Sequence, residues 1–272
     1  QAAWWLPKHL RLKQLTHMRT SNVDITKELP TVLSFCSGYG GIERGLNLAG
    51  FKHRVIAYVE IEAFAIANLL SKMESGQLEP APIYTNIKTF PAHLFRDKVS
   101  LITGGYPCQP FSSNGNRKGK DDPRHLWPFI RKHMQAIRPR KCFFENVEGH
   151  ISLGLSSVIS DMEEDGYGAT WGIFSASEVF AEHQRKRVFI LAHTNGTYGR
   201  GRRIPNGMDK EYAHVDSGGH EEGGSTPQQW LPEPRVGRVV DGCADRVDRL
   251  RMLGNGVVPQ TAAKAWQKLN NR

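Results

Sequence analysis

Between residues 31 and 192 the chain alternates short apolar, β-branched runs with stretches whose apolar residues recur at helical spacing. The pattern predicts strands at 31–35, 53–59, 99–103, 141–144, 167–175 and 187–192, and helices at 42–48, 62–72, 126–137, 154–164 and 261–269. Neighbouring parallel strands need a long crossover, which a helix supplies. We therefore predict an α/β fold, with a mixed, mainly parallel sheet and helices on both faces.

Composition divides the chain into three parts. Residues 1–193 hold the alternating pattern after a basic, polar extension at 1–29, in which a helix is predicted near 10–17. Residues 194–234 are rich in glycine and lack apolar periodicity, so this segment cannot form a core of its own. Apolar patterning returns at 235–272. We predict one large domain, a small recognition segment and a C-terminal segment that rejoins the large domain.

The chain is basic, with a formal charge of +9 and a pI of about 9.5. This favours a polyanionic partner, although a solvated basic surface explains it equally well. No stretch approaches the ~20 apolar residues of a membrane span. The four cysteines form no C-x-x-C pair, which argues against a zinc site and against disulfides. We expect a cytoplasmic protein without a membrane partner or a metal.

A glycine turn follows the first predicted strand. Its sequence, Gly38-Tyr39-Gly40-Gly41, has neither the dinucleotide spacing nor a P-loop lysine, so a phosphate cradle is unsupported. Glu60 stands at the tip of the second strand, where a carboxylate suits a ribose diol. Together these residues suggest an adenosine-type cofactor without a pyrophosphate, while a plain tight turn explains the glycines equally well.

Cys108 lies between two prolines just after the strand at 99–103, and Glu145 follows the strand at 141–144. Strand ends of such sheets carry their chemistry. A thiol can attack an electron-poor ring carbon while a carboxylic acid, kept protonated by burial, donates to a nitrogen of that ring. The predicted substrate is a pyrimidine. The alternative for Glu145 is a carboxylate that stabilises a helix N-terminus.

Basic residues precede the strand at 187–192. Arg185 and Arg187 could lower the pKa of a nearby thiol, although a solvated basic turn is the favoured interpretation of this segment taken alone. The other cysteines, Cys36, Cys142 and Cys243, have apolar neighbours and are interpreted as small hydrophobic residues.

Taken in order, these motifs resemble those of the cytosine-C5 DNA methyltransferases, especially the compact bacterial and phage members. The resemblance covers residues 31–192 and resumes at 235, and its most specific segments are Pro107-Cys108-Gln109 and Glu145-Asn146-Val147. It implies a Rossmann-like, S-adenosylmethionine-dependent methyltransferase fold with a small irregular target-recognition domain. It also implies DNA (cytosine-5-)-methyltransferase activity on double-stranded DNA.

The resemblance also implies roles for individual residues. Cys108 would attack C6 of a flipped-out cytosine and Glu145 would protonate N3, with Arg185 and Arg187 near the ring and the thiol. S-adenosylmethionine would contact Cys36, Gly38, Tyr39, Gly40, Gly41, Glu60, Ile61, Asn86, Pro107, Asn255 and Val257. DNA would contact Gln109, Ser112, Arg117, Lys118, Arg200, Arg202 and Arg203.

Further expectations concern partners and specificity. We expect a monomer of bacterial or phage origin that releases S-adenosylhomocysteine. Whether a cognate restriction endonuclease accompanies it in the same host stays open. The short segment at 194–234 predicts a short or relaxed recognition sequence. Two alternatives stay open: a tRNA cytosine-C5 methyltransferase of the same fold, and a catalytically silent DNA-binding module. The presence of Cys108, Glu145 and Arg187 together argues against the silent module.

Overall fold

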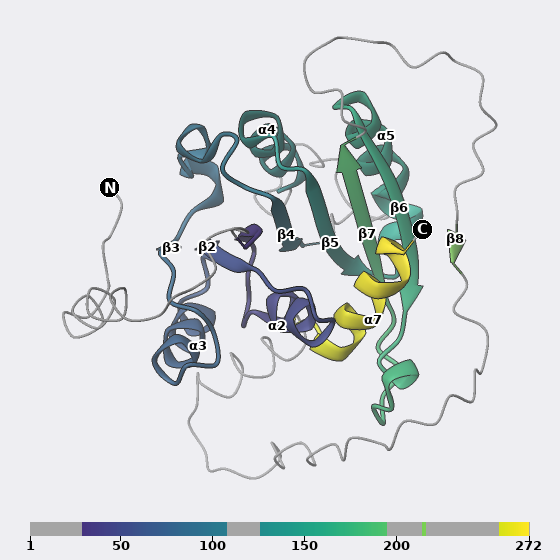
Figure 1. Cartoon of the computed structure of the whole chain (residues 1–272). Coiled ribbons are helices and arrows are strands. Elements are labelled where there is room, and N and C mark those ends of the chain that lie inside the picture. Colours follow the sequence, from purple (N-terminus) through teal and green to yellow (C-terminus); the bar gives the residue numbers. More distant parts are fainter. Residues whose placement is uncertain (1–28, 108–125, 195–213, 216–255, 272) are drawn as a thin grey trace, which may run out of the picture.

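A twisted sheet forms the centre of the molecule (Figure 1). The computed structural model describes residues 29–107, 126–194, 214–215 and 256–271, and within them the strand order is β3-β2-β1-β4-β5-β7-β6-β8. The strands are β1 (Thr31–Phe35), β2 (Arg54–Val59), β3 (Ile83–Tyr84), β4 (Leu101–Gly105), β5 (Lys141–Val147), β6 (Tyr167–Phe174), β7 (Arg187–Thr194) and β8 (His214–Val215).

Among the described strands, β7 alone runs against its neighbours. It pairs antiparallel with both β5 and β6, whereas the other neighbouring pairs are parallel. The chain leaves β1 toward β2 on one side, and β4 pairs with β1 on the other. A reversal of strand order of this kind opens a crevice at the carboxyl ends of the central strands, where open α/β sheets bind ligands.

Helices cover both faces of the sheet. On one face lie α2 (Gly41–Leu48), α3 (Ala63–Glu74) and α7 (Pro259–Asn270), and on the other lie α4 (Trp127–Ile137) and α5 (Ser156–Glu164). Short helical turns are η1 (Ile87–Thr89), η2 (Ala92–Phe95), η3 (Ile151–Leu155) and η4 (Ser177–Val179). The predicted fold class, a mixed and mainly parallel sheet between two helical layers, is confirmed.

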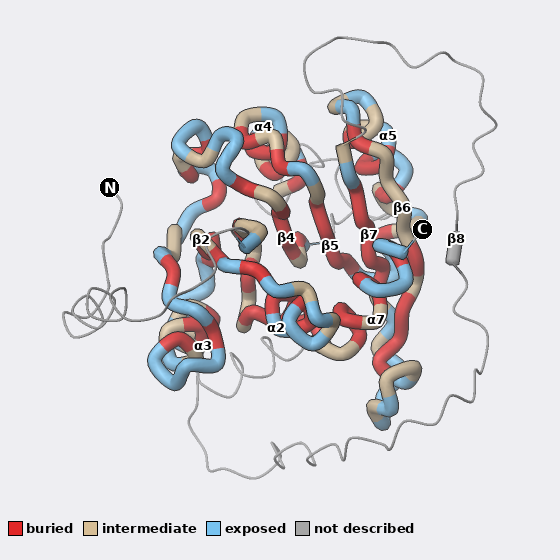
Figure 2. The backbone as a smooth tube through the Cα atoms, in the orientation of Figure 1, coloured by how far each residue is buried: buried red, intermediate tan, exposed pale blue. Residues whose placement is uncertain are grey.

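The central strands are apolar at successive positions because both of their faces are covered (Figure 2). In β5, Cys142 and Phe144 join the buried cluster beneath α4 and α5, whereas Phe143 joins the cluster beneath α2 and α7. Side chains of a strand alternate between its faces, so this run supplies two cores at once.

Helix α7 lies directly against α2. A Cβ atom on Gly45 would lie 2.6 Å from the Cβ of Ala262 and 2.6 Å from the carbonyl oxygen of Pro259, so only glycine permits this approach. The α7 side chain of Trp266 meets the Phe143 ring at a centroid distance of 5.3 Å. This packing brings the residues that precede α7 to the carboxyl end of β1.

The structure differs from the predicted elements mainly at their ends. β5 continues past residue 144 to Val147, because Val147 still pairs with Arg187 of β7. The two-residue β3 and the helical turns carry too little periodicity to be predicted.

Within the predicted recognition segment, 194–234, the structure describes Thr194, which ends β7, and His214–Val215, which form β8. Strand β8 pairs with β6 at the edge of the sheet. The predicted helix at 10–17 lies outside the described residues. No helix in the described ranges is long and apolar enough to cross a bilayer.

Candidate active site

The glycine turn joins β1 to α2 through left-handed backbone. Gly38 has φ of +53° and Gly40, which caps α2, has φ of +76°. A non-glycine residue at either position would be strained. The hydroxyl of Ser37 donates to the carbonyl oxygen of Ser34 at 3.0 Å, and the Gly40 N–H donates to that of Ser37 at 2.9 Å. The N-terminus of α2 therefore faces the crevice at the end of β1.

Glu60 fixes the other side of this turn. Its Oε2 accepts the Gly38 N–H at 2.7 Å, and its Oε1 accepts the N–H groups of Ile61 at 2.8 Å and Glu62 at 2.9 Å. The side chain is buried. A carboxylate has about four acceptor positions, so one position of Oε2 is still available to a further donor such as a sugar hydroxyl.

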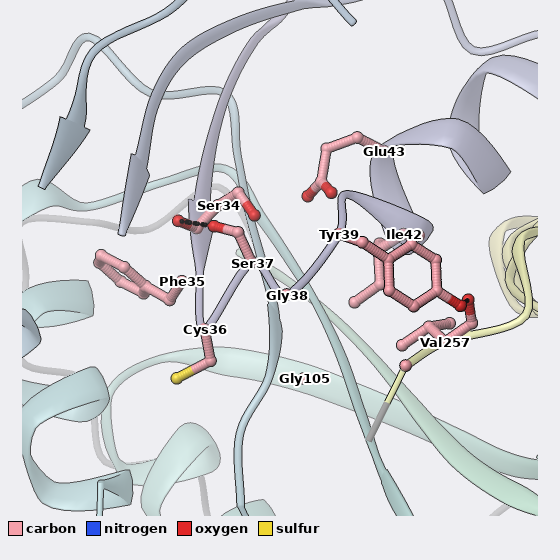
Figure 3. A pocket seen from close by; sticks show the side chains of 12 residues that line it. Ser34, Phe35, Cys36, Ser37, Gly38, Tyr39, Ile42, Glu43, Gly105 and Val257 are labelled. Atoms are coloured by element: carbon pink, nitrogen blue, oxygen red, sulfur yellow. Dashed lines mark hydrogen bonds between the residues drawn. The ribbon is translucent and has the colours of Figure 1, made fainter. Parts of the chain in front are cut away.

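A pocket opens beside the turn (Figure 3). It is lined by residues from the end of β1, the turn, the first turn of α2, the end of β4 and the segment before α7: Ser34, Phe35, Cys36, Ser37, Gly38, Tyr39, Gly41, Ile42, Glu43, Gly105, Gly256 and Val257. Five predicted cofactor residues line this pocket, namely Cys36, Gly38, Tyr39, Gly41 and Val257. The structure thus brings together segments that are about 200 residues apart.

Glu145 is a buried acid at the carboxyl end of β5. The Nε atom of Arg187 lies 2.9 Å from its Oε1, and only 5% of the residue is exposed. Burial raises the pKa of Glu145 to about 7, and the lowering effects of Arg187 and Arg185 do not cancel this. A carboxyl group with that pKa is present in both protonation states near neutral pH, which suits a general acid.

Gly105 joins the Glu145 carboxyl to the pocket. It pairs with Glu145 across β4 and β5, and a Cβ atom on it would lie 3.2 Å from Glu145 Oε2. Gly105 is also part of the pocket lining. A molecule in the pocket would therefore lie one glycine away from a proton donor.

Asn146 holds the chain that follows β4. Its Nδ2 donates to the carbonyl oxygen of Tyr106 at 3.1 Å, and its Oδ1 accepts the Val147 N–H at 2.9 Å. The Tyr106 hydroxyl lies 3.0 Å from Nε2 of His150, and burial lowers the pKa of His150 to about 4, so this ring is neutral. These contacts fix the residue before Pro107.

Several of these residues were not predicted as site residues. Two of them carry a signal in the sequence that could have identified them: Asn146 is the middle of the Glu145-Asn146-Val147 segment, and Gly105 ends a Gly-Gly pair after a strand. Nothing in the sequence pointed to Glu43, a helix residue whose buried carboxylate accepts the Thr103 hydroxyl at 2.6 Å.

Some predicted cofactor residues do not line the pocket. Glu60 is one of them, although it accepts the N–H of Gly38, which does line it. Ile61 and Pro107 are exposed, and Asn86 is an exposed residue whose Oδ1 accepts the Lys88 N–H at 2.9 Å. Gly40 faces the side chain of Leu78. Their predicted contacts with the cofactor stay predictions.

The remaining predicted site residues lie outside the described residues. They are Cys108, Gln109, Ser112, Arg117, Lys118, Arg200, Arg202, Arg203 and Asn255. Their roles stay predictions.

Comparison with known proteins supports the resemblance seen in the motifs. Residues 31–217 match the family model described as C-5 cytosine-specific DNA methylase. The type II methyltransferase M.NgoMIV of Neisseria gonorrhoeae is 31% identical over 170 residues, 61% of this chain and 52% of that protein. M.NaeI of Lentzea aerocolonigenes is 32% identical over 169 residues, 60% of this chain and 40% of that protein. The chain thus matches about half, or less, of the length of these relatives.

Solved structures show a similar fold. The S. pombe Dnmt2 methyltransferase is 28% identical with a TM-score of 0.52, covering 62% of this chain and 52% of that one. A mutant of Spodoptera frugiperda DNMT2 is 22% identical with a TM-score of 0.51, covering 65% and 54%, and carries information on the fold alone.

Proposed function

Since the chain belongs to the C-5 cytosine-specific DNA methylase family, we propose that it transfers the methyl group of S-adenosylmethionine to C5 of a cytosine turned out of duplex DNA. One observation carries the proposal: the pocket at the glycine turn and the buried acid Glu145 meet at Gly105. A cofactor bound in this pocket would lie beside a proton donor, which supports methyl transfer to the C5 of a cytosine that is protonated at N3.

Several features of the pocket support S-adenosylmethionine as its ligand. Glu60 presents a fixed carboxylate beside the turn, suited to ribose hydroxyls. A Cβ atom on Gly38 would have nothing within 4 Å, so a ligand can approach the backbone there. Cys36 and Val257 add apolar lining. When bound there, S-adenosylmethionine supplies an electrophilic methyl group.

The protein's own residues would prepare the cytosine. In this proposal the thiolate of Cys108 adds to C6, while Glu145 donates its proton to N3 and so neutralises the charge that develops on the ring. C5 thereby becomes nucleophilic enough to accept a methyl group. S-adenosylhomocysteine is the leaving group of the transfer, after which a base removes the C5 proton. The Cys108–C6 bond then breaks to release the thiolate, N3 returns its proton to the Glu145 carboxylate, and the ring regains its aromaticity.

Arg187 would orient the acid during this sequence. Its guanidinium lies 2.9 Å from Oε1 of Glu145, so the other oxygen of the carboxyl is the one that can carry the proton to the substrate. Oε2 is also the oxygen that lies beside Gly105. The oxygen that would carry the proton is therefore the one next to a residue of the pocket lining.

Duplex DNA is the proposed partner, and the protein would act on it as a monomer. Turning one base out of the stack costs a few kcal/mol, which contacts with the phosphates must offset. A formal charge of +9 is consistent with such contacts. Because relatives are type II methyltransferases, we also propose that a restriction endonuclease accompanies it.

The proposal is tested by methyl transfer from labelled S-adenosylmethionine to unmethylated duplex DNA and to tRNA in parallel. We expect label in DNA alone, none with Cys108→Ser, and a covalent complex of the wild type with DNA containing 5-fluorocytosine. Label in tRNA alone, or full turnover by Cys108→Ser, would contradict it. DNA binding without any transfer would indicate a silent module.

Methylation mapping of DNA from expressing cells tests the predicted specificity. We expect a short or degenerate recognition sequence, because the recognition segment predicted at 194–234 is small. A fixed site of six or more base pairs would contradict this part of the proposal.

A further inference from the structure

Two donors hold the backbone of residues 256 and 257 against the active site. The hydroxyl of Tyr39 donates to the carbonyl oxygen of Val257 at 2.5 Å, and an NH group of Arg185 donates to that of Gly256 (Figure 3 shows the first bond). Tyr39 belongs to the glycine turn, and Arg185 precedes β7. The held segment lies 218 positions from Tyr39 along the chain.

Tyr39 is itself fixed. The Nζ atom of Lys72 donates to the Tyr39 carbonyl oxygen at 2.7 Å and lies 4.6 Å from the centre of the ring, within range of a cation–π interaction. Burial raises the pKa of Tyr39 to about 12, so its hydroxyl keeps its proton and remains a donor. The Val257 carbonyl oxygen can only accept, so the Tyr39 hydroxyl is the donor of this bond.

The contact between the turn and this segment leaves no room for side chains. A Cβ atom on Gly256 would lie 1.9 Å from Cε1 of Tyr39, and one on Gly41 would lie 2.5 Å from the carbonyl oxygen of Val257. Cβ atoms do not come this close to other heavy atoms. The fit therefore depends on glycine at both positions and on the Tyr39 ring between them.

We propose that Tyr39 is a positioning residue that, together with Arg185, holds the Gly256–Val257 backbone in place as one wall of the cofactor pocket. Gly256 and Val257 are the pocket residues that arrive from the far end of the described chain, next to α7. The bonds of Tyr39 and Arg185 are what join them to the turn and to the β7 side of the site. This inference rests on the proposed function, in which the pocket takes S-adenosylmethionine.

The substitution Tyr39→Phe removes the hydroxyl and keeps the ring. We expect the Kd for S-adenosylhomocysteine, measured by calorimetry on the full chain, to rise by roughly 2- to 10-fold, as expected for one hydrogen bond. The KM for S-adenosylmethionine should rise by a larger factor than kcat falls. The control is Tyr167→Phe, which loses a hydroxyl bond of 3.0 Å to the Pro139 carbonyl oxygen, on the far side of the sheet from α7. It should leave the Kd unchanged.

A second measurement does not depend on the cofactor. Hydrogen exchange of the amides at residues 257, 258 and 260–263 should be faster in Tyr39→Phe than in the wild type or in Tyr167→Phe, because the wall is less firmly held. A wild type that binds no S-adenosylhomocysteine would overturn the proposed function, and exchange would still test the positioning role. Unchanged exchange and unchanged Kd in Tyr39→Phe would overturn that role.

A double-mutant cycle tests the fit of the ring. Gly256→Ala should weaken binding of S-adenosylhomocysteine by more than ~5-fold in the wild type, because an added methyl group meets the Tyr39 ring. In a Tyr39→Ala background the same change should cost less than ~2-fold, since the clash is gone. Equal losses in the two backgrounds would show that the ring does not position this segment.

Discussion

The two ends of the active site are built in different ways. At the glycine turn, main-chain groups define the site. Three backbone N–H groups donate to the carboxylate of Glu60, and glycines allow the close approach of neighbouring segments. At the end of β5, charged side chains define the site: the buried Glu145 lies against the partly buried Arg187, and the partly buried Arg185 donates to the Gly256 carbonyl oxygen. One end is defined by shape and the other by charge.

This difference separates affinity from rate. Changes of shape at the glycine turn should act on how tightly the cofactor binds, whereas changes of charge at Glu145 should act on how fast the methyl group is transferred. A substitution at either end can therefore be judged by whether it changes the affinity for the cofactor or the rate of methyl transfer.

The largest effect is expected from Glu145→Gln. The amide cannot donate an acidic proton to N3, so kcat should fall by roughly 10²- to 10⁴-fold while the Kd for S-adenosylhomocysteine changes little. Single-turnover methylation and calorimetry measure the two quantities. Glu148→Gln, a change at a half-exposed carboxylate 3.8 Å from Lys186, is the control and should retain activity. Equal losses of rate and affinity in Glu145→Gln would mean that the two ends are not separable.

Gly41→Ala should act mainly on affinity and stability. Its Cβ would lie 2.5 Å from the Val257 carbonyl oxygen, so the turn or the wall must shift, at a cost of about 1–3 kcal/mol. We expect cofactor binding weakened by roughly 5- to 100-fold. Gly149→Ala, at a position with nothing within 4 Å of the added atom, is the matched control. A fall in kcat without a change in Kd would break the comparison.

Glu60→Gln should weaken binding of the cofactor by about 10-fold. The side-chain NH₂ cannot accept hydrogen bonds from the N–H groups that now donate to the carboxylate. Hydrogen bonds to charged groups contribute about 1.5–3 kcal/mol. Calorimetry with S-adenosylhomocysteine measures the change. Glu74→Gln, at the exposed end of α3, should have no effect. Tight binding by Glu60→Gln would remove Glu60 from the cofactor site.

The smallest expected effect is on stability against pH. The pKa of Glu145 is raised by folding, from 4.5 to about 7, so the proton it keeps stabilises the folded state at low pH and this stabilisation is lost as the pH rises through 7. Glutamine does not titrate. Between pH 5 and pH 8, the free energy of unfolding of Glu145→Gln, measured in urea, should therefore rise relative to that of the wild type by about 1 kcal/mol or more. The opposite trend would mean that the ion pair with Arg187 outweighs burial.

Most of the fold could be predicted from the sequence because covered parallel strands and their crossover helices repeat a clear pattern. The alternation of apolar runs with helical spacing gave every strand of the sheet except β3 and β8, which are two residues long. The extension of β5 to Val147 was missed because it depends on pairing with β7, some 40 residues further on. Strand ends that depend on a distant partner are not visible locally.

The site was predictable where local sequence carries the geometry. The glycine turn and Glu60 could be recognised in this way, because turn and strand-end positions are encoded next to each other. In the wall, Val257 was predicted from the family resemblance, whereas Gly256 was not, since its role appears only when α7 packs on α2. Glu43 was missed because a glutamate on a helix looks solvated until Thr103 is found opposite it.

The hydrogen bond between Tyr39 and Val257 also has a consequence for synthesis on the ribosome. The glycine turn emerges early, but its partner follows 218 residues later, a delay of roughly 10–40 s at about 5–20 residues per second. Throughout that interval the nascent chain has the turn and lacks the wall. Under the proposed function, a polypeptide that stalls or ends before residue 257 lacks this wall and should therefore bind the cell's methyl donor more weakly.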